Sequence, residues 1–277
     1  AEFVVGGGVI DAQSESTNPD GPIACGVTLD GKLDCFVNGP LALAVPDGTF
    51  EHVAVGTNNV CAIRDDHTLA CFDSGPTDAP AGAFQQVSVG WSEACALDTD
   101  GAVTCWELNT GTLVSSPSGA FEQVVVISEE GVGAADSEAC GLSGGALECW
   151  DAYGQRELRG PFKQFAPNTD QRFGEQYLLR PDGSIVTSAE NPSEGTFYVS
   201  EHEAWGSGFL KLGVGQKYAY ALAVDGSVVA ITLRDDTATL LPIAGPEEQL
   251  VDISVGRDFV CGLRRDGNFR CFGSIVH

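Results

Sequence analysis

Residues 84–106 read FQQVSVGWSEACALDTDGAVTCW, and this stretch decides the fold. Apolar residues alternate with polar ones in three short runs, a pattern typical of half-buried β-strands. Asp100-Gly101 separates the second and third runs, and a glycine there adopts the positive φ of a tight hairpin turn at no steric cost. Cys95 and Cys105 lie on either side of that turn, where antiparallel strands face each other. The stretch therefore predicts a three-stranded meander with a disulfide across one hairpin.

The same unit recurs along the chain at a period of roughly 34 to 47 residues, which is typical of solenoids, propellers and other arrays. The copies begin near residues 3, 50, 84, 121, 162, 209 and 250. A sheet of three or four short strands cannot bury both faces alone, and blades arranged radially leave only short edges exposed. We therefore expect an all-β, seven-bladed β-propeller with intra-blade cross-strand disulfides, forming a single domain over residues 1–277.

Two copies, Val87–Trp106 and Ile253–Phe272, best match a repeat of the form VxVGxxxxCALxxDGxVxCW. This pattern resembles the regulator-of-chromosome-condensation propellers. The version with paired cysteines resembles the extracellular propellers of plant Crinkly-type receptor kinases and secreted bacterial proteins of the same superfamily. The resemblance covers nearly the whole chain except residues 7–22 and 189–208. It implies a propeller fold but no single function, because its members differ in what their loops bind.

The ten cysteines fall into five pairs, each split by a hairpin turn. The pairs are Cys25/Cys35, Cys61/Cys71, Cys95/Cys105, Cys140/Cys149 and Cys261/Cys271. A zinc site is the alternative, but zinc sites use closely spaced ligands that converge on one ion. Two copies lose both members of the pair together, which favours disulfides. Disulfides imply an oxidising compartment, so we expect a secreted or cell-surface protein.

The formal net charge of −25 argues against partners that carry phosphate, so we expect no nucleic-acid binding. No apolar run approaches the roughly 20 residues of a membrane span, and we expect no direct membrane insertion. The acidity has three explanations: solubility, a saline habitat or loose calcium binding. Asp98-Thr-Asp100-Gly101 resembles the start of a calcium loop, but an Asp-Gly hairpin turn explains the motif without a metal. We expect no metal or cofactor, with calcium as the alternative.

The loops that follow the first strand of each copy vary, while the scaffold around them repeats. Variable loops on a rigid scaffold are where binding residues concentrate, and Trp, Tyr and Arg are frequent anchors. Simple drift of loop sequences is the competing explanation. The predicted binding residues are Asn59, Trp91, Glu93, Lys217, Tyr218, Arg257 and Asp258. Trp106 and Trp150 directly follow the second cysteine of their copies, and we expect them to pack between blades.

The sequence thus predicts a monomeric extracellular binding module that recognises a protein or glycan through the loops on one propeller face. An extracellular polysaccharide hydrolase or lyase with a carboxylate-based site on that face is the alternative. Catalysis has less support, because neither His52 nor His67 has an evident nucleophile partner in the sequence. A purely structural module of a larger surface protein is the third interpretation.

Overall fold

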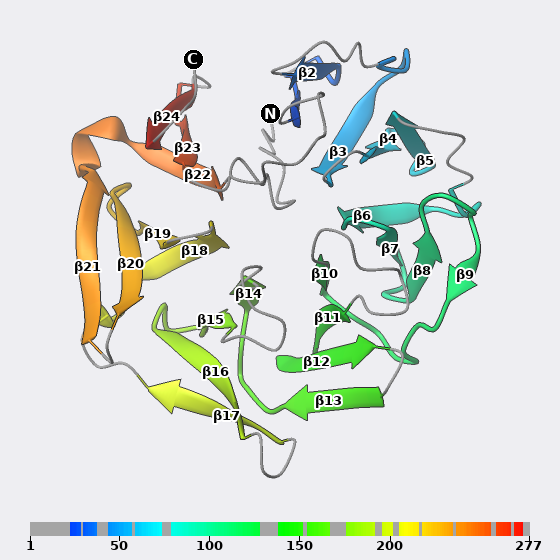
Figure 1. Ribbon diagram of the computed structural model, residues 1–277. Helices are drawn as coiled ribbons and strands as arrows, with labels where there is room; N and C mark the ends of the chain where they lie inside the picture. The colour runs from blue at the N-terminus through cyan, green and yellow to red at the C-terminus, as the bar shows by residue number, and fades with distance from the viewer. Residues whose placement is uncertain are drawn as a thin grey trace. The chain divides into compact units, whose positions relative to one another are not determined.

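The computed structural model describes most of the 277-residue chain, and Figure 1 draws the remainder as a thin grey trace. The described residues are 23–28, 30–37, 44–56, 59–73, 79–127, 138–151, 154–166, 176–191, 196–201, 205–215, 218–234, 237–255, 259–266 and 269–273. Within them, the regular elements are β-strands and the short 3-10 helix η3 (Pro246–Glu248). The predicted all-β class is confirmed.

In the described part of the chain, each sheet is built from strands that follow one another in the sequence (Figure 1). A two-stranded hairpin contains β1 (Ile23–Val27) and β2 (Leu33–Val37), and a three-stranded sheet contains β3 (Phe50–Val55), β4 (Asn59–Arg64) and β5 (Leu69–Asp73). Two four-stranded sheets follow: β6 (Phe84–Val89), β7 (Glu93–Asp98), β8 (Val103–Glu107) and β9 (Leu113–Val114), then β10 (Gln123–Ile127), β11 (Glu138–Ser143), β12 (Ala146–Asp151) and β13 (Gly154–Leu158).

Three further sheets complete the described chain. The first contains β14 (Gln164–Ala166), β15 (Tyr177–Leu179), β16 (Ile185–Asn191) and β17 (Thr196–Glu201). The second contains β18 (Phe209–Val214), β19 (Ala219–Ala223), β20 (Val228–Arg234) and β21 (Thr237–Ala244). The last contains β22 (Leu250–Val255), β23 (Phe259–Arg264) and β24 (Phe269–Gly273). Every strand pair whose register is described is antiparallel, for example β7 with β8 and β22 with β23.

The structure corrects the predicted number of blades. Among the described residues, six sheets have three or four strands and qualify as blades, whereas β1 and β2 form a two-stranded hairpin. The apolar run at Phe3, which the sequence assigned to the first copy, belongs to residues 1–22 and lies outside the described residues. The described part of the chain is therefore an all-β propeller with six blades rather than seven.

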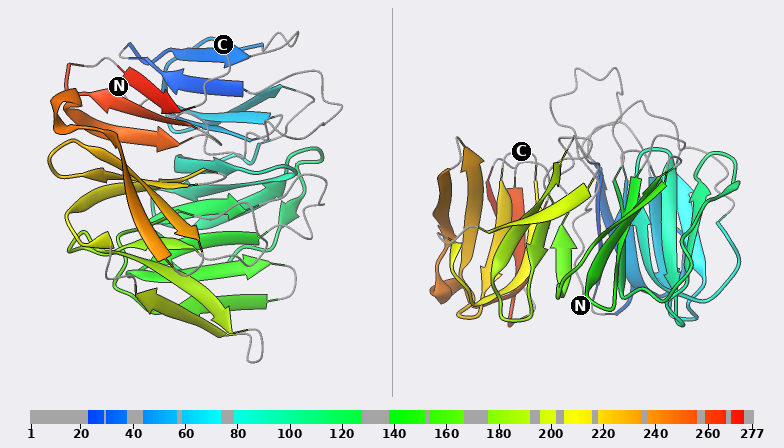
Figure 2. Two further views of the ribbon diagram at one scale, coloured as in Figure 1. Left: turned by 60° about the vertical axis from the view of Figure 1, so that its left-hand side comes forward. Right: turned by 90° about the horizontal axis from the view of Figure 1, so that it is seen from below.

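Residue contacts divide the chain into two compact units, residues 1–143 with 149–155, and residues 144–148 with 156–277. In each unit, the innermost strand of a blade buries alternate residues, as β3, β6 and β22 show. The second strand is buried almost throughout, as in β4 and β7, because neighbouring sheets cover both of its faces. Figure 2 shows the sheets of each unit packed face to face. The prediction of a single domain over residues 1–277 stays a prediction.

All five predicted disulfides are confirmed, and each joins two neighbouring strands of one sheet. The bonded pairs are Cys25–Cys35, Cys61–Cys71, Cys95–Cys105, Cys140–Cys149 and Cys261–Cys271. Cys95, for example, directly faces Cys105 across β7 and β8, with 4.0 Å between the two Cα atoms. The described residues contain no free cysteine. Cys25–Cys35 joins the two strands of the β1–β2 hairpin.

The ten cysteines are not covered equally, although their spacing in the sequence is nearly the same. The second cysteine of three pairs, Cys35, Cys71 and Cys271, is only partly buried. Each of these three belongs to the last strand of a described sheet that has no fourth strand, namely β2, β5 or β24. Their counterparts Cys105 and Cys149 lie in four-stranded sheets and are at most 1% exposed. Among the described residues, the cysteines of the four-stranded sheets are therefore the more completely buried, as Cys105 is beside β9.

The hairpin turns also hold the next blade in place. The backbone N–H of Phe121 donates to the carbonyl of Gly101 at 2.8 Å, and that of Phe209 donates to Gly183 at 3.0 Å. Both glycines have positive φ, 87° and 82°. A Cβ on Gly183 would lie only 2.8 Å from the backbone nitrogen of Phe209. The turn conformation and the close approach of the next blade therefore require glycine for two separate reasons.

Glutamine side chains form a second link between blades. Gln86 in β6 donates to the carbonyl of Val124 at 3.2 Å and accepts from its N–H at 3.0 Å. Gln164 in β14 makes the same pair of bonds with Leu212 in β18, both at 2.9 Å. Each glutamine side chain thus bonds a backbone N–H and a carbonyl on the innermost strand of the following blade. Without it, these two groups would lie unpaired at the edge of that blade's sheet. We call these contacts the glutamine clamps.

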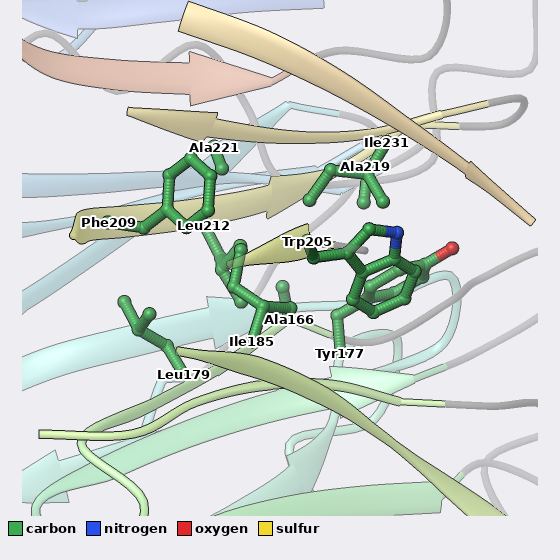
Figure 3. Packing of buried hydrophobic residues seen from close by; sticks show 10 residues of the cluster. All are labelled: Ala166, Tyr177, Leu179, Ile185, Trp205, Phe209, Leu212, Ala219, Ala221 and Ile231. Carbon is green, nitrogen blue, oxygen red and sulfur yellow. The ribbon is translucent and has the colours of Figure 1, made fainter. Parts of the chain in front are cut away.

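The core lies between the blades. Trp106 is fully buried in a cluster with Phe84 and with Cys61 of the preceding blade, and Trp150 packs on Phe121 with ring centroids 5.6 Å apart. The predicted packing role of these two tryptophans is confirmed. In the second unit, Trp205 stacks on Tyr177 at 5.8 Å within a cluster that joins two blades (Figure 3). Trp205 is therefore also a core residue.

Candidate functional site at the loop end of the blades

Each blade has two distinct ends. At one end, the hairpin turn between the second and third strands contacts the next blade, as Gly101 does. At the other, a loop connects the innermost strand to the second strand, and we call this the loop end. In the blade β6–β9 that loop consists of Gly90, Trp91 and Ser92. The backbone anchors both sides of it, because Gly90 N–H donates to Glu93 O at 2.8 Å and Leu108 N–H donates to Ser92 O at 2.9 Å.

Two predicted site residues occupy the same position at this end. Asn59 begins β4 and Glu93 begins β7, and each is only 5% exposed. Glu138 and Gln176 hold the equivalent position in the next two copies and are also buried, at 8% and 2% exposure. Four of the six buried polar side chains among the described residues thus share one position of the repeat. Sequence reasoning missed Glu138 and Gln176, although aligning the copies on their cysteines places all four in register.

Glu93 lies against a disulfide. Its Oε1 is 3.7 Å from Cys95 Sγ, and Glu93 is the direct cross-strand partner of Glu107. Burial, and then the negative charge of Glu107, raise the pKa of the Glu93 carboxyl to about 7. The side chains of Glu93, Cys95 and Cys105 lie within 4.8 Å of one another, as do those of Glu138, Cys140 and Cys149. Neither group offers a thiolate to a metal ion, because the cysteines are bonded to each other.

The aromatic residues of the predicted site differ in their surroundings. Trp91 is half-buried and belongs to the first unit. Tyr218 is also half-buried, and its ring meets Tyr220 edge-on with 6.3 Å between centroids. Tyr218 packs beside the core of the second unit, so part of its role is structural. Lys217, Arg257 and Asp258 lie outside the described residues. The structure therefore brings Asn59, Trp91 and Glu93 to the loop end of the first unit.

The aspartates of the hairpin turns serve the turns themselves. Asp182 Oδ1 accepts hydrogen bonds from Ser184 N–H and Oγ at 2.9 and 2.7 Å, and Asp225 accepts the same pair from Ser227 at 2.9 and 2.6 Å. The serine hydrogen bonds hold the pKa of both carboxyls below their usual value. In the motif that resembles a calcium loop, Asp98 Oδ1 accepts from the backbone of Asp100 and Ala102, both at 2.8 Å. These contacts favour a hairpin turn, rather than a calcium loop, as the explanation of Asp98-Thr-Asp100-Gly101.

Among the described residues, no helix is long and apolar enough to span a membrane. No protein-family model matches the sequence, and comparison with curated proteins gives no match.

Solved structures do resemble this one. The ectodomain of the receptor kinase CR4 from Physcomitrella patens is 16% identical, with a TM-score of 0.59 over 91% of this chain and 70% of that one. The CRINKLY WD40 ectodomain of the receptor kinase ACR4 from Arabidopsis thaliana is 16% identical, with a TM-score of 0.55 over 91% and 92%. Prp20p from Saccharomyces cerevisiae, a protein studied for its binding to Gsp1p and histones, is 14% identical, with a TM-score of 0.50 over 70% and 58%.

At identities this low, the likeness establishes the fold alone. In fold, it confirms the resemblance to the regulator-of-chromosome-condensation propellers and to the Crinkly ectodomains. Function has to be argued from the site itself.

Proposed function

We propose that this protein is an extracellular binding module that recognises a protein or glycan through the loop end of its blades. The observation that carries the proposal is Trp91, a half-buried aromatic on a loop whose two ends are fixed by backbone hydrogen bonds. The blade beneath it is held by the Cys95–Cys105 disulfide and by the Gln86 clamp. A large side chain on a preorganised loop binds a partner with little entropy cost.

The comparisons and the disulfides support the same conclusion. CR4 and ACR4 are propellers that form receptor ectodomains, and Prp20p is a propeller whose partners are proteins. Five disulfides are typical of proteins that fold in an oxidising compartment, which favours a secreted or cell-surface location. Of the two ligand classes, a protein therefore has the stronger support.

The alternative of a polysaccharide hydrolase or lyase has less support. It requires a carboxyl group that the substrate can reach, at a defined distance from a second carboxyl. Glu93 has a raised pKa that would suit a general acid, but it is only 5% exposed and lies against a disulfide. A carboxyl buried to this degree cannot reach a glycosidic oxygen directly.

Binding screens of the purified protein test the proposal, on a glycan array and on a display library of extracellular proteins. Substituting Trp91 with alanine should weaken binding of the selected ligand at least tenfold. Val224→Ala is the matched control, because this apolar residue is 68% exposed in a hairpin turn at the opposite end of its blade. A ligand bound equally well by Trp91→Ala and by the unchanged protein would refute the placement. Degradation of a bound polysaccharide would favour the enzyme.

A further inference from the structure

Two acidic residues, Glu93 and Glu107, lie opposite each other in the strand register at the loop end of the blade β6–β9. They are direct cross-strand partners. Each lies two residues from a cysteine of the Cys95–Cys105 pair, and therefore on the same face of the hairpin as that pair. Glu107 is partly exposed, and its Oε2 accepts a hydrogen bond from Thr110 Oγ1 at 2.7 Å. These positions are fixed by the register of the strands and by the disulfide next to them.

The Glu93 carboxylate lacks the partners that a buried charge needs. Glu93 is 5% exposed, and among the described residues the only polar contact of its oxygens within hydrogen-bond range is with Cys95 Sγ at 3.7 Å. The sulfur of a disulfide has no hydrogen to donate. Burying an ionised carboxylate without a donor or a counter-charge costs roughly several kcal/mol, and a like charge directly opposite adds to that cost.

We propose that Glu93 and Glu107 bind a divalent cation of the calcium class at the loop end of this blade. Such a cation supplies the missing counter-charge. Carboxylate oxygens are the preferred ligands of calcium, magnesium and manganese, whereas zinc and copper favour nitrogen and sulfur ligands. The site is separate from the hairpin-turn aspartates, whose Oδ1 atoms accept hydrogen bonds from their own turns. It goes beyond the proposed function and does not depend on it.

The distribution of charge favours a cation at this place. Residues 1–155 contain 2 basic and 23 acidic residues, whereas residues 156–277 contain 12 and 16, giving formal net charges of −21 and −4. The site thus lies in the part of the chain that carries most of the negative charge. A field of this sign raises the local concentration of divalent cations around the first unit.

Terbium luminescence tests the proposal, because Tb³⁺ replaces calcium at oxygen-ligand sites and is excited by energy transfer from a nearby tryptophan. Trp106 directly precedes Glu107, and Trp91 lies two positions before Glu93. Protein stripped with a chelator is titrated with Tb³⁺ at pH 7.5. We expect a saturable signal that calcium competes away. Glu93→Gln and Glu107→Gln should each weaken Tb³⁺ binding at least tenfold.

Glu122→Gln is the matched control, since this exposed glutamate lies at the opposite end of its blade, next to the start of β10. Its affinity for Tb³⁺ should equal that of the unchanged protein. Thermal unfolding gives a second readout: calcium should raise the unfolding temperature of the unchanged protein and of Glu122→Gln, but not of the two site variants. The proposal is overturned if no saturable Tb³⁺ signal appears, or if the Glu93 and Glu107 variants bind as tightly as the control.

Discussion

The glutamine clamp between β6 and β10 gives the sharpest test of how the blades are held together. Replacing Gln86 with leucine keeps the approximate size of the side chain and removes both of its bonds to Val124. The N–H and the carbonyl of Val124 then lose their partners at a partly buried position. A lost bond to a buried backbone group costs about 1 to 1.5 kcal/mol. The expected destabilisation is therefore about 2 to 3 kcal/mol.

Equilibrium denaturation in guanidinium chloride, with the disulfides intact, measures this loss. Gln85→Leu is the matched control, because the neighbouring Gln85 is exposed and its amide donates only to the carbonyl of Asp98 at 2.9 Å. Its effect should stay within about 0.5 kcal/mol. Gln86→Glu is a second probe, since a carboxylate still accepts from Val124 N–H but cannot donate to the carbonyl. Equal stabilities of Gln86→Leu and Gln85→Leu would refute the role of the clamp.

Three further predictions concern single positions. In buffer containing a chelator, the free energy of unfolding should fall by about 3 kcal/mol between pH 4.5 and 7 because of Glu93, since the folded state holds this proton more tightly than the unfolded chain. Glu93→Gln should remove that fall from pH-dependent denaturation curves, and an unchanged slope would contradict the raised pKa. His67 has a φ of 66° in a turn where other copies have glycine, so His67→Gly should stabilise the protein by about 0.5 to 1 kcal/mol. A lower denaturation midpoint for this variant would contradict the strain. Gly183→Ala should destabilise by more than about 2 kcal/mol, because the turn has φ of 82° and the new Cβ would meet backbone 2.8 Å away; a loss below about 1 kcal/mol would show that the turn adapts.

The candidate site could be predicted from the sequence only in part. The loop end is visible because residues vary there while the repeat is constant, and this placed Asn59, Trp91 and Glu93 at the same end of their blades. The burial of Asn59 and Glu93 was not foreseeable, because a polar residue after a loop gives no indication of what covers it. Only the folded chain shows that Glu138 and Gln176, at the equivalent position, are buried as well. Lys217, Arg257 and Asp258 stay predictions.

The cysteines show the same division between local and distant causes. Their pairing could be predicted because it depends on one hairpin alone. The partial exposure of Cys35, Cys71 and Cys271 could not, because it depends on whether a further strand lies beyond the disulfide. The linker that would form such a strand gives no period-2 pattern strong enough to predict it.

Local chemistry by itself determined the blades and their disulfides. Alternating apolar runs, Asp-Gly turns and symmetric cysteines act within about ten residues, so Cys95 and Cys105 had to face each other once the hairpin formed. Only the tertiary structure decided what links one blade to the next. Gln86 reaches Val124, 38 residues along the chain, through groups that no local pattern pairs. The second reason for glycine at Gly183 also depends on a neighbour distant in sequence, because it follows from how closely the next sheet approaches the turn.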